Sequence, residues 1–238
     1  MSPDGSRIAV TLQSGKDADI WIFDIPGNTL SKLTFGGVNK TAAWSPDGKR
    51  IAYYAYDGGK FSVYVKQADG SGEPTMLSSG HGRSYIDDWS HDGKFLILDV
   101  AGTSRTPNGP GGSDIFILPV DGDPALKPFL ETQFDEWQAS VSPDGKWIAY
   151  SSNESGVYQV YIKPFPEGGG RWAVSPDEGY RPLWAPDGKT LYYYAPGKLI
   201  SVPIQTIPSL AVGRPQTLLG GYQQKSVDSG LMYDISPD

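Results

Sequence analysis

The sequence contains no cysteine and only two histidines among its 238 residues. The first absence excludes disulfide bonds, thiolate metal sites and cysteine nucleophiles. His81 lies in a glycine-rich connection and His91 in a turn, so they do not form the His-x-x-x-His pair of a zinc site. The nucleophile elbow Gly-x-Ser-x-Gly and the phosphate-binding loop Gly-x-x-x-x-Gly-Lys are also missing. We therefore expect no catalytic residue, no metal and no cofactor in these residues.

Long apolar runs and clusters of positive charge are equally scarce. The sequence has no apolar stretch of about 18 residues and no amino-terminal signal pattern. We therefore expect these residues neither to span a membrane nor to contact one directly. Asp and Glu number 27 against 20 Lys and Arg, which gives a net charge of −7 at pH 7. This balance argues against a nucleic-acid partner.

The sequence also lacks helical periodicity. No window of about 11 or more residues places its apolar side chains at the spacing of a helix. Instead, the 30 glycines and 20 prolines suit many short strands that are joined by turns. The composition therefore predicts an all-β chain.

One four-residue turn, Ser-Pro-Asp-Gly, recurs along the whole chain. Its copies begin at Ser2, Ser45, Ser90 (with His91 in place of proline), Ser142, Ala185 and Ser236. Successive starts are 43, 45, 52, 43 and 51 residues apart, and about 40 to 45 residues is the length of one four-stranded propeller blade. Proline presets the first corner of the turn, aspartate bonds its own backbone, and glycine takes the left-handed position. Each complete copy therefore predicts a tight hairpin between two strands.

The stretch after each turn is densely apolar. Residues 50–54, 95–98 and 147–150 do not alternate apolar with polar side chains. A strand that is apolar on both faces is covered on both sides, as it is inside a propeller. We therefore predict a single β-propeller domain over residues 1–238, built from four-stranded antiparallel blades. The blades span approximately residues 1–37, 38–79, 80–133, 134–176 and 177–220, and the first lacks its innermost strand.

Residues 231–236 have the pattern of an innermost strand without a blade. Either this strand fills the missing place in the first blade and closes a five-bladed ring, or the chain is a fragment of a six- or seven-bladed ring. Residues 101–113 interrupt the third blade and are rich in Gly, Pro, Ser and Thr. We expect a mobile surface loop there.

The positions that differ between the repeats carry the functional information. In a propeller, the connections that enter the innermost strands gather at one mouth of the central channel. Here they combine aromatic residues with arginines and carboxylates, which binding surfaces favour. The alternative is a solvated rim whose aromatic side chains only shield the core. The residues predicted to bind a ligand or partner are Arg83, Tyr85, Asp87, Glu136, Trp137, Tyr180 and Arg181.

The segment 44–53, which reads Trp-Ser-Pro-Asp-Gly-Lys-Arg-Ile-Ala-Tyr, resembles the WD40-like (PD40) propeller repeat of the TolB family. The resemblance recurs five times and covers essentially the whole chain. More narrowly, residues 19–35, 151–156, 161–166 and 184–194 look like the propellers that follow membrane-anchored serine/threonine kinases in soil bacteria such as acidobacteria. That resemblance implies a kinase domain and a transmembrane helix upstream, further blades on both sides, and an extracytoplasmic location on the periplasmic side. It favours the fragment over the five-bladed ring.

Together these features predict a non-catalytic binding or sensing module, attached to a signalling kinase. Rigid blades would present the mouth residues to a protein, a peptide or a small ligand, and we expect a monomeric domain. Two alternatives remain open. The substrate-gating propeller of a prolyl-oligopeptidase or dipeptidyl-peptidase-like serine hydrolase predicts a Gly-x-Ser-x-Gly segment in the same reading frame. A periplasmic TolB-type assembly protein predicts an export signal and a small α/β domain upstream.

Overall fold

The computed structural model describes residues 1–106, 109–122, 125–167, 169–221 and 234–235. These residues form strands, turns and bends without an α-helix, so the all-β prediction is confirmed. Within them, no helix is long and apolar enough to cross a membrane. The chain divides into two compact units. Unit 1 comprises Met1–Gly102, Phe116–Lys127 and Ile235, and unit 2 comprises the described parts of Thr103–Ile115 and Pro128–Asp234.

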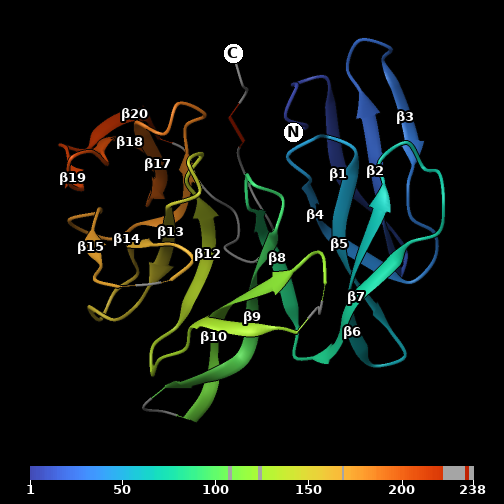
Figure 1. Cartoon of the computed structure of the whole chain (residues 1–238), viewed down its shortest axis with the longest axis horizontal. Helices are drawn as coiled ribbons and strands as arrows, with labels where there is room; N and C mark the ends of the chain where they lie inside the picture. Colours follow the sequence, from blue (N-terminus) through green and yellow to red (C-terminus); the bar gives the residue numbers. More distant parts are fainter. Residues whose placement is uncertain (107–108, 123–124, 168, 222–233, 236–238) are drawn as a thin grey trace. The chain divides into compact units, whose positions relative to one another are not determined.

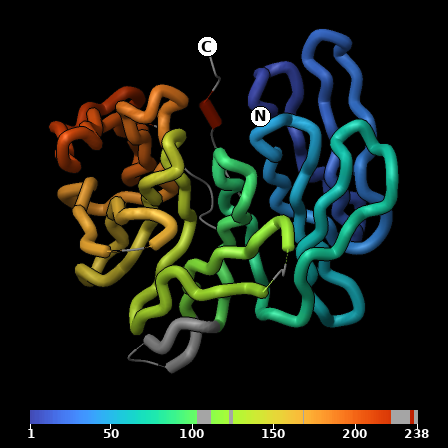
Figure 2. The backbone as a smooth tube through the Cα atoms, viewed as in Figure 1, coloured from blue at the N-terminus to red at the C-terminus, as the bar shows by residue number. Residues whose placement is uncertain are grey.

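The first two repeats of unit 1 form two antiparallel groups of strands (Figure 1). The strands of the first group are β1 (Arg7–Ser14), β2 (Asp17–Asp24) and β3 (Thr29–Lys32). Those of the second are β4 (Val38–Trp44), β5 (Arg50–Asp57), β6 (Lys60–Gln67) and β7 (Thr75–His81). Each strand pairs with the next in its group, and a single parallel pair between Ala18 and Val38 links β2 to β4. Figure 2 shows the course of the backbone through this part of the chain.

The third sheet has the order β11-β10-β9-β8. Its strands are β8 (Ser84–Trp89), β9 (Phe95–Thr106), β10 (Gly109–Pro119) and β11 (Lys127–Leu130). The predicted surface loop over residues 101–113 is wrong, because β9 runs to Thr106 and β10 starts at Gly109. Composition favoured a loop, but pairing two extended arms satisfies backbone groups that an irregular loop would leave to water. Residues 107–108 of that stretch lie outside the described residues.

The remaining two sheets belong to unit 2 and repeat the same order. The fourth contains β12 (Glu136–Val141), β13 (Trp147–Ser152), β14 (Gln159–Pro164) and β15 (Trp172–Ala173). The fifth contains β16 (Tyr180–Trp184), β17 (Thr190–Ala195), β18 (Lys198–Gln205), β19 (Ala211–Val212) and β20 (Gln216–Gly220), the last two both pairing with β18. The innermost strand predicted at 231–236 falls outside the described residues, apart from Asp234 and Ile235.

The turns that begin at Ser2, Ser45, Ser90 and Ser142 are small hydrogen-bonded units centred on that serine. The buried Ser45 hydroxyl donates to Asp47 Oδ1 at 2.5 Å and accepts from the Arg50 backbone N–H at 2.8 Å. Asp47 Oδ1 also accepts from the Lys49 N–H at 3.0 Å, and Gly48 has the predicted left-handed φ of 66°. The same serine and aspartate bonds recur in the turns at Ser2, Ser90 and Ser142.

Apolar cores lie between neighbouring sheets within each unit. In unit 1, Ile20 and Ile22 of the first group pack with Ile51 and Tyr53 of the second. In unit 2, residues of β13 and β14 pack against β16 to β18. Residues 51–54 and 148–152 are buried at consecutive positions, so β5 and β13 are covered on both faces as predicted. The strand β1 differs, because its second half is exposed.

Candidate ligand-binding site on the inner strands

The first strand of the second to fifth repeats carries an irregularity at the same place. We call β4, β8, β12 and β16 the inner strands. Each has a shift in its pairing with the following strand, four residues or so before the turn. Three of the shifts place a non-glycine residue in the left-handed region: Thr41 (φ 49°), Gln138 (φ 57°) and Arg181 (φ 53°). Bulges of this kind redirect side chains and are frequent beside functional sites.

The bulges also connect neighbouring inner strands. Gln138 Oε1 accepts from the Arg181 backbone N–H at 3.1 Å, and Ser151 Oγ accepts from the same group at 3.2 Å. In unit 1, Thr41 Oγ1 accepts from the Ile86 N–H at 3.4 Å. The left-handed residue of one inner strand thus holds the next inner strand in register.

Three predicted site residues, Arg83, Tyr85 and Asp87, lie in unit 1. Arg83 is exposed, and its guanidinium carbon lies 4.9 Å from the centre of the Tyr85 ring. Tyr85 meets Tyr54 edge to face with ring centres 5.7 Å apart, and Asp87 is half-buried. This end of β8 therefore carries an aromatic face that is occupied by a cation of the chain itself.

Four predicted residues lie in unit 2, and two of them form part of an aromatic row. We use this name for Trp137, Tyr158 and Tyr180, whose neighbouring ring centres are 5.4 and 5.5 Å apart. All three side chains are half-buried. The Tyr158 hydroxyl donates to Asp135 and the Tyr180 hydroxyl donates to Glu178. Burial, reinforced by these bonds to carboxylates, raises the pKa of both tyrosines.

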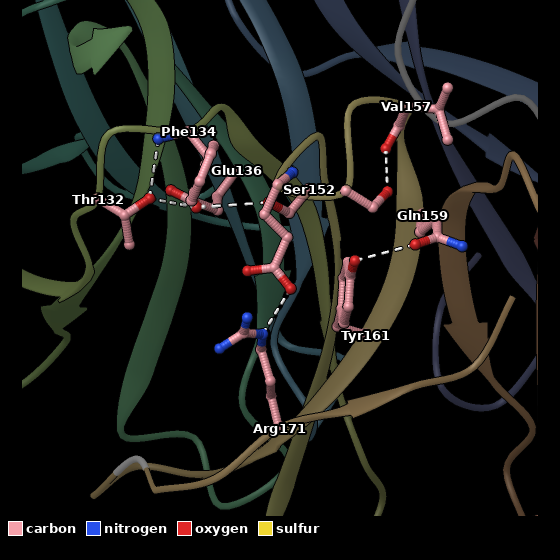
Figure 3. Close-up of polar contacts among 10 residues, drawn as sticks. Thr132, Phe134, Glu136, Ser152, Val157, Gln159, Tyr161 and Arg171 are labelled. Atoms are coloured by element: carbon pink, nitrogen blue, oxygen red, sulfur yellow. Dashed lines mark hydrogen bonds and ion pairs between the residues drawn. The ribbon is translucent and has the colours of Figure 1, made fainter. Parts of the chain in front are cut away.

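The other two, Glu136 and Arg181, are almost fully buried. Glu136 is 1% exposed and Arg181 is 7% exposed. Glu136 Oε1 accepts from the Thr132 hydroxyl at 2.6 Å and from the Ser152 hydroxyl at 3.5 Å (Figure 3). Burial raises the pKa of Glu136 to about 8, the Thr132 bond opposes this, and the neighbouring Asp114 adds to it. Neither side chain offers a surface to a ligand.

The hydrogen bonds of Asn39, at the equivalent position in unit 1, indicate why Glu136 is buried. There, Asn39 Nδ2 donates to the buried Asp19 at 3.0 Å, and the Thr34 hydroxyl donates to the same carboxylate at 3.1 Å. Asn39 and Glu136 each lie six residues before their turn. In unit 2, Asp114 accepts from the Thr132 N–H at 3.2 Å and is hydrogen-bonded to Glu136. Burial and the neighbouring Asp114 therefore favour the protonated form of Glu136, at the position where the second repeat has the amide of Asn39.

None of the predicted site residues takes part in a metal site, and none lines the cavity found in unit 1. No group of three or more His, Asp or Glu in the described ranges is arranged to hold a metal ion. A cavity of about 190 Å³ in unit 1 is lined by Arg7, Lys32 and Asp24 among others, and it contains none of the predicted site residues. Its cations already have partners, since Lys32 pairs with Asp19 at 2.8 Å and Arg7 donates to the Gly48 carbonyl at 2.7 Å.

Tyr158 is the site residue that the sequence analysis missed. It lies just before β14, where the repeats gave no reason to separate it from the strand. The pairing of successive strands would have revealed its position. Trp137 pairs with Ser151, and Ser151 pairs with Val160. These pairs bring the residue that precedes β14 beside the start of β12.

Repeated four-stranded antiparallel sheets, each entered through a bulged inner strand and a Ser-Pro-Asp-Gly turn, define a propeller of the WD40-like type. The family model described as "TolB beta propeller domain" (PD40) matches residues 1–108 and 41–209. The chain belongs to this family. The propeller fold and the TolB-like family that the sequence suggested are therefore confirmed.

Two relatives show how far sequence similarity extends. An uncharacterised protein of Agrobacterium fabrum is 28% identical over 207 residues, covering 81% of this chain and 67% of that protein. The Tol-Pal system protein TolB of Bordetella pertussis is 28% identical over 158 residues, covering 66% of this chain and 34% of that protein. The chain thus matches about a third of that TolB.

Two solved structures share the fold. TolB from Acinetobacter baumannii is similar with a TM-score of 0.73 at 21% identity, over 92% of this chain and 54% of that one. The β-propeller domain of the Trilobed protease from Pyrococcus furiosus gives a TM-score of 0.63 at 16% identity, over 92% of this chain and 68% of that one. At these identities the similarity establishes the propeller fold.

Proposed function

We propose that this chain is a non-catalytic binding module that holds a protein or peptide partner against the beginnings of its inner strands. The observation that carries the proposal is the set of half-buried aromatic residues at one repeated position, five residues before the turn. Tyr85, Trp137 and Tyr180 occupy this position in three successive repeats. Half-exposed tyrosine and tryptophan offer a large contact area at a small cost in side-chain entropy.

The way these residues are held supports binding with little rearrangement. Bulge bonds fix the inner strands within each unit, and ring contacts to Tyr54 and Tyr158 orient Tyr85, Trp137 and Tyr180. A preorganised surface loses little conformational entropy when a partner binds. In each unit by itself, the binding residues stand at strand ends that are ordered by the fold, so neither unit depends on a loop that closes.

The proposal also covers the cellular location of the module and the kind of protein to which it is attached. We propose that it lies outside the cytoplasm and is attached to a signalling kinase, as the resemblance of residues 19–35 and 184–194 implies. The relative from Bordetella pertussis is named as a component of the Tol-Pal system, which supports a role in contacts between proteins. Reading the coding sequence on both sides tests this setting: kinase motifs followed by about 20 apolar residues upstream support it, and a hydrolase segment with a serine elbow overturns it.

The binding role is tested by selecting a random peptide library displayed on phage against the immobilised chain. The counter-selection uses a variant with Tyr85→Ala, Trp137→Ala and Tyr180→Ala. We expect enriched peptides that bind the parent at least about tenfold more tightly than the variant, while a cooperative melting transition shows that the variant remains folded at the temperature of selection. Peptides that bind both proteins equally, or no enrichment at all, would overturn the proposal.

A further inference from the structure

The aromatic row of unit 2 differs from its counterpart in unit 1 in one respect. Tyr85 in unit 1 has the Arg83 guanidinium over its ring at 4.9 Å. Trp137 and Tyr180 occupy the same repeat position, but none of the cation–ring contacts found among the described residues falls on the aromatic row. The described part of the chain therefore supplies no cation to these half-buried rings, and the further ring contact of Tyr180 is with Tyr194, whose centre lies 6.5 Å away.

The surroundings of the row make these faces more attractive to a cation. The hydroxyls of Tyr158 and Tyr180 donate to Asp135 and Glu178. A phenol that donates to a carboxylate shifts electron density onto its ring, and the negative face of an aromatic ring is what attracts a cation. Glu178 is exposed at the edge of the row, so a bound cation would meet a carboxylate as well as a ring.

Resting on the binding role proposed above, we propose that the aromatic row binds an arginine side chain of the partner, stacked on the rings in the way that Arg83 lies over Tyr85. Arginine fits better than lysine, because its planar guanidinium stacks on aromatic faces while its N–H groups bond carboxylates. The net charge of −7 attracts such a partner from a distance.

Calorimetric titration with a peptide of alternating Gly and Arg tests this assignment. The matched probe replaces every arginine by citrulline, which keeps the size and shape of the side chain and removes its charge. We expect the arginine peptide to bind the parent chain at least about tenfold more tightly than the citrulline peptide, since a partly desolvated cation–ring contact is worth that much. Equal affinity for the two peptides would overturn the assignment.

Three variants locate the binding. Tyr180→Leu removes a ring and should weaken binding of the arginine peptide about tenfold, whereas Tyr180→Phe keeps the ring, loses only the bond to Glu178 and should weaken it about threefold. Trp172→Leu is the matched control, because Trp172 is a 39% exposed aromatic residue of the same unit outside the row. It should leave the affinity unchanged. An equal loss in Trp172→Leu and Tyr180→Leu would indicate general attraction to an acidic surface and overturn the assignment.

The experiments distinguish failure of the arginine assignment from failure of the proposed binding function. Library peptides that need Tyr85, Trp137 and Tyr180 but contain no arginine would keep the proposed function and overturn only the arginine assignment. Failure of the library selection, together with site-independent binding of the arginine peptide, would overturn both. Melting curves of each variant show whether a loss of affinity reflects a loss of fold.

Discussion

The guanidinium carbon of Arg50 lies 5.1 Å from the centre of the Trp89 ring. Arg50 follows the turn of the second repeat and Trp89 precedes the turn of the third. The same relationship recurs one repeat earlier, where Arg7 lies 4.7 Å from the centre of the Trp44 ring. A basic residue that comes after one turn and a tryptophan that comes before the next therefore join successive repeats of unit 1.

A double-mutant cycle tests this contact. Arg50→Ala and Trp89→Leu should each lower the free energy of unfolding, and their effects should be non-additive by about 0.5–1 kcal/mol, the value of a partly exposed cation–ring contact. Urea unfolding of the four proteins gives the coupling. The control pairs Lys49→Ala, an exposed neighbour, with Trp89→Leu and should be additive. Additivity in both cycles would mean that the stacking contributes nothing measurable.

The serine of the turn is open to a test in both directions, because the fifth repeat has Ala185 in its place. Ser45→Ala leaves the Arg50 N–H without its acceptor and should cost about 1–2 kcal/mol. Ala185→Ser should add about 1 kcal/mol, since the Thr190 N–H and Asp187 stand where the partners of Ser45 stand. Thermal and urea unfolding measure both changes. A stabilising Ser45→Ala or a destabilising Ala185→Ser would contradict the role assigned to the hydroxyl.

Acid unfolding gives a second measure of the same turn. The Ser45 hydroxyl bond, with the Lys49 N–H, lowers the pKa of Asp47. A lowered pKa in the folded state contributes stability above the unfolded pKa, and this stability is lost as the pH falls through the folded value. Ser45→Ala should therefore lose less stability on acidification than the parent does. A steeper loss in the variant would be the contrary result.

Much of the fold follows from local chemistry that a single sequence displays. The Ser-Pro-Asp-Gly turns fix hairpins through short-range bonds, so they are predictable wherever the four residues occur. Continuous apolar runs such as 51–54 likewise reveal strands that are covered on both faces. Residues 101–113 escaped prediction because strand pairing in this stretch, which is rich in Gly, Pro, Ser and Thr, depends on the partner strand and not on the stretch's own propensity.

The repeat register places Tyr85, Trp137 and Tyr180 at one equivalent position. The structure puts this position within the first residues of the inner strands and not in the connections that enter them. The hydrogen bonds around Glu136 and Arg181 come from other segments, since the Thr132 hydroxyl bonds the Glu136 carboxyl and the Ser151 hydroxyl accepts from the Arg181 backbone N–H, and no local pattern reveals them. Tyr158 joins the row only through the registers of two successive strand pairs.

Two substitutions of the left-handed residue Gln138 distinguish the contribution of backbone strain to stability from that of the side-chain hydrogen bond. Gln138→Ala loses the side-chain oxygen that accepts from Arg181 and keeps a Cβ at a φ of 57°. Gln138→Gly loses the same oxygen and relieves the strain, so it should be more stable than Gln138→Ala by about 1 kcal/mol. Chemical denaturation compares the two. Equal stability would mean that the bulge relaxes once its side-chain bond is gone.

The buried pair of Glu136 and Asp114 should make the stability of the fold fall as the pH rises. Burial and Asp114 raise the pKa of Glu136 to about 8. A group whose folded pKa is raised stabilises fully below its unfolded pKa, and this contribution is lost as the pH rises through the folded value. Glu136→Gln keeps an N–H donor for Asp114 and an oxygen for Thr132 at every pH, as Asn39 does for Asp19. The variant should match the parent near pH 5 and exceed it by about 2 kcal/mol near pH 9.

Urea unfolding at several pH values measures this difference, and Glu178→Gln supplies the control. Glu178 is an exposed carboxyl two residues before Tyr180, and its substitution should leave the dependence on alkaline pH unchanged. If the free energy of unfolding of Glu136→Gln falls with rising pH as steeply as that of the parent, Glu136 and Asp114 do not share a proton. The buried Glu136 would then have to be ionised beside Asp114, and Glu136→Gln should stabilise the fold equally at every pH above the ordinary carboxyl range, because it removes a buried charge that faces another of the same sign.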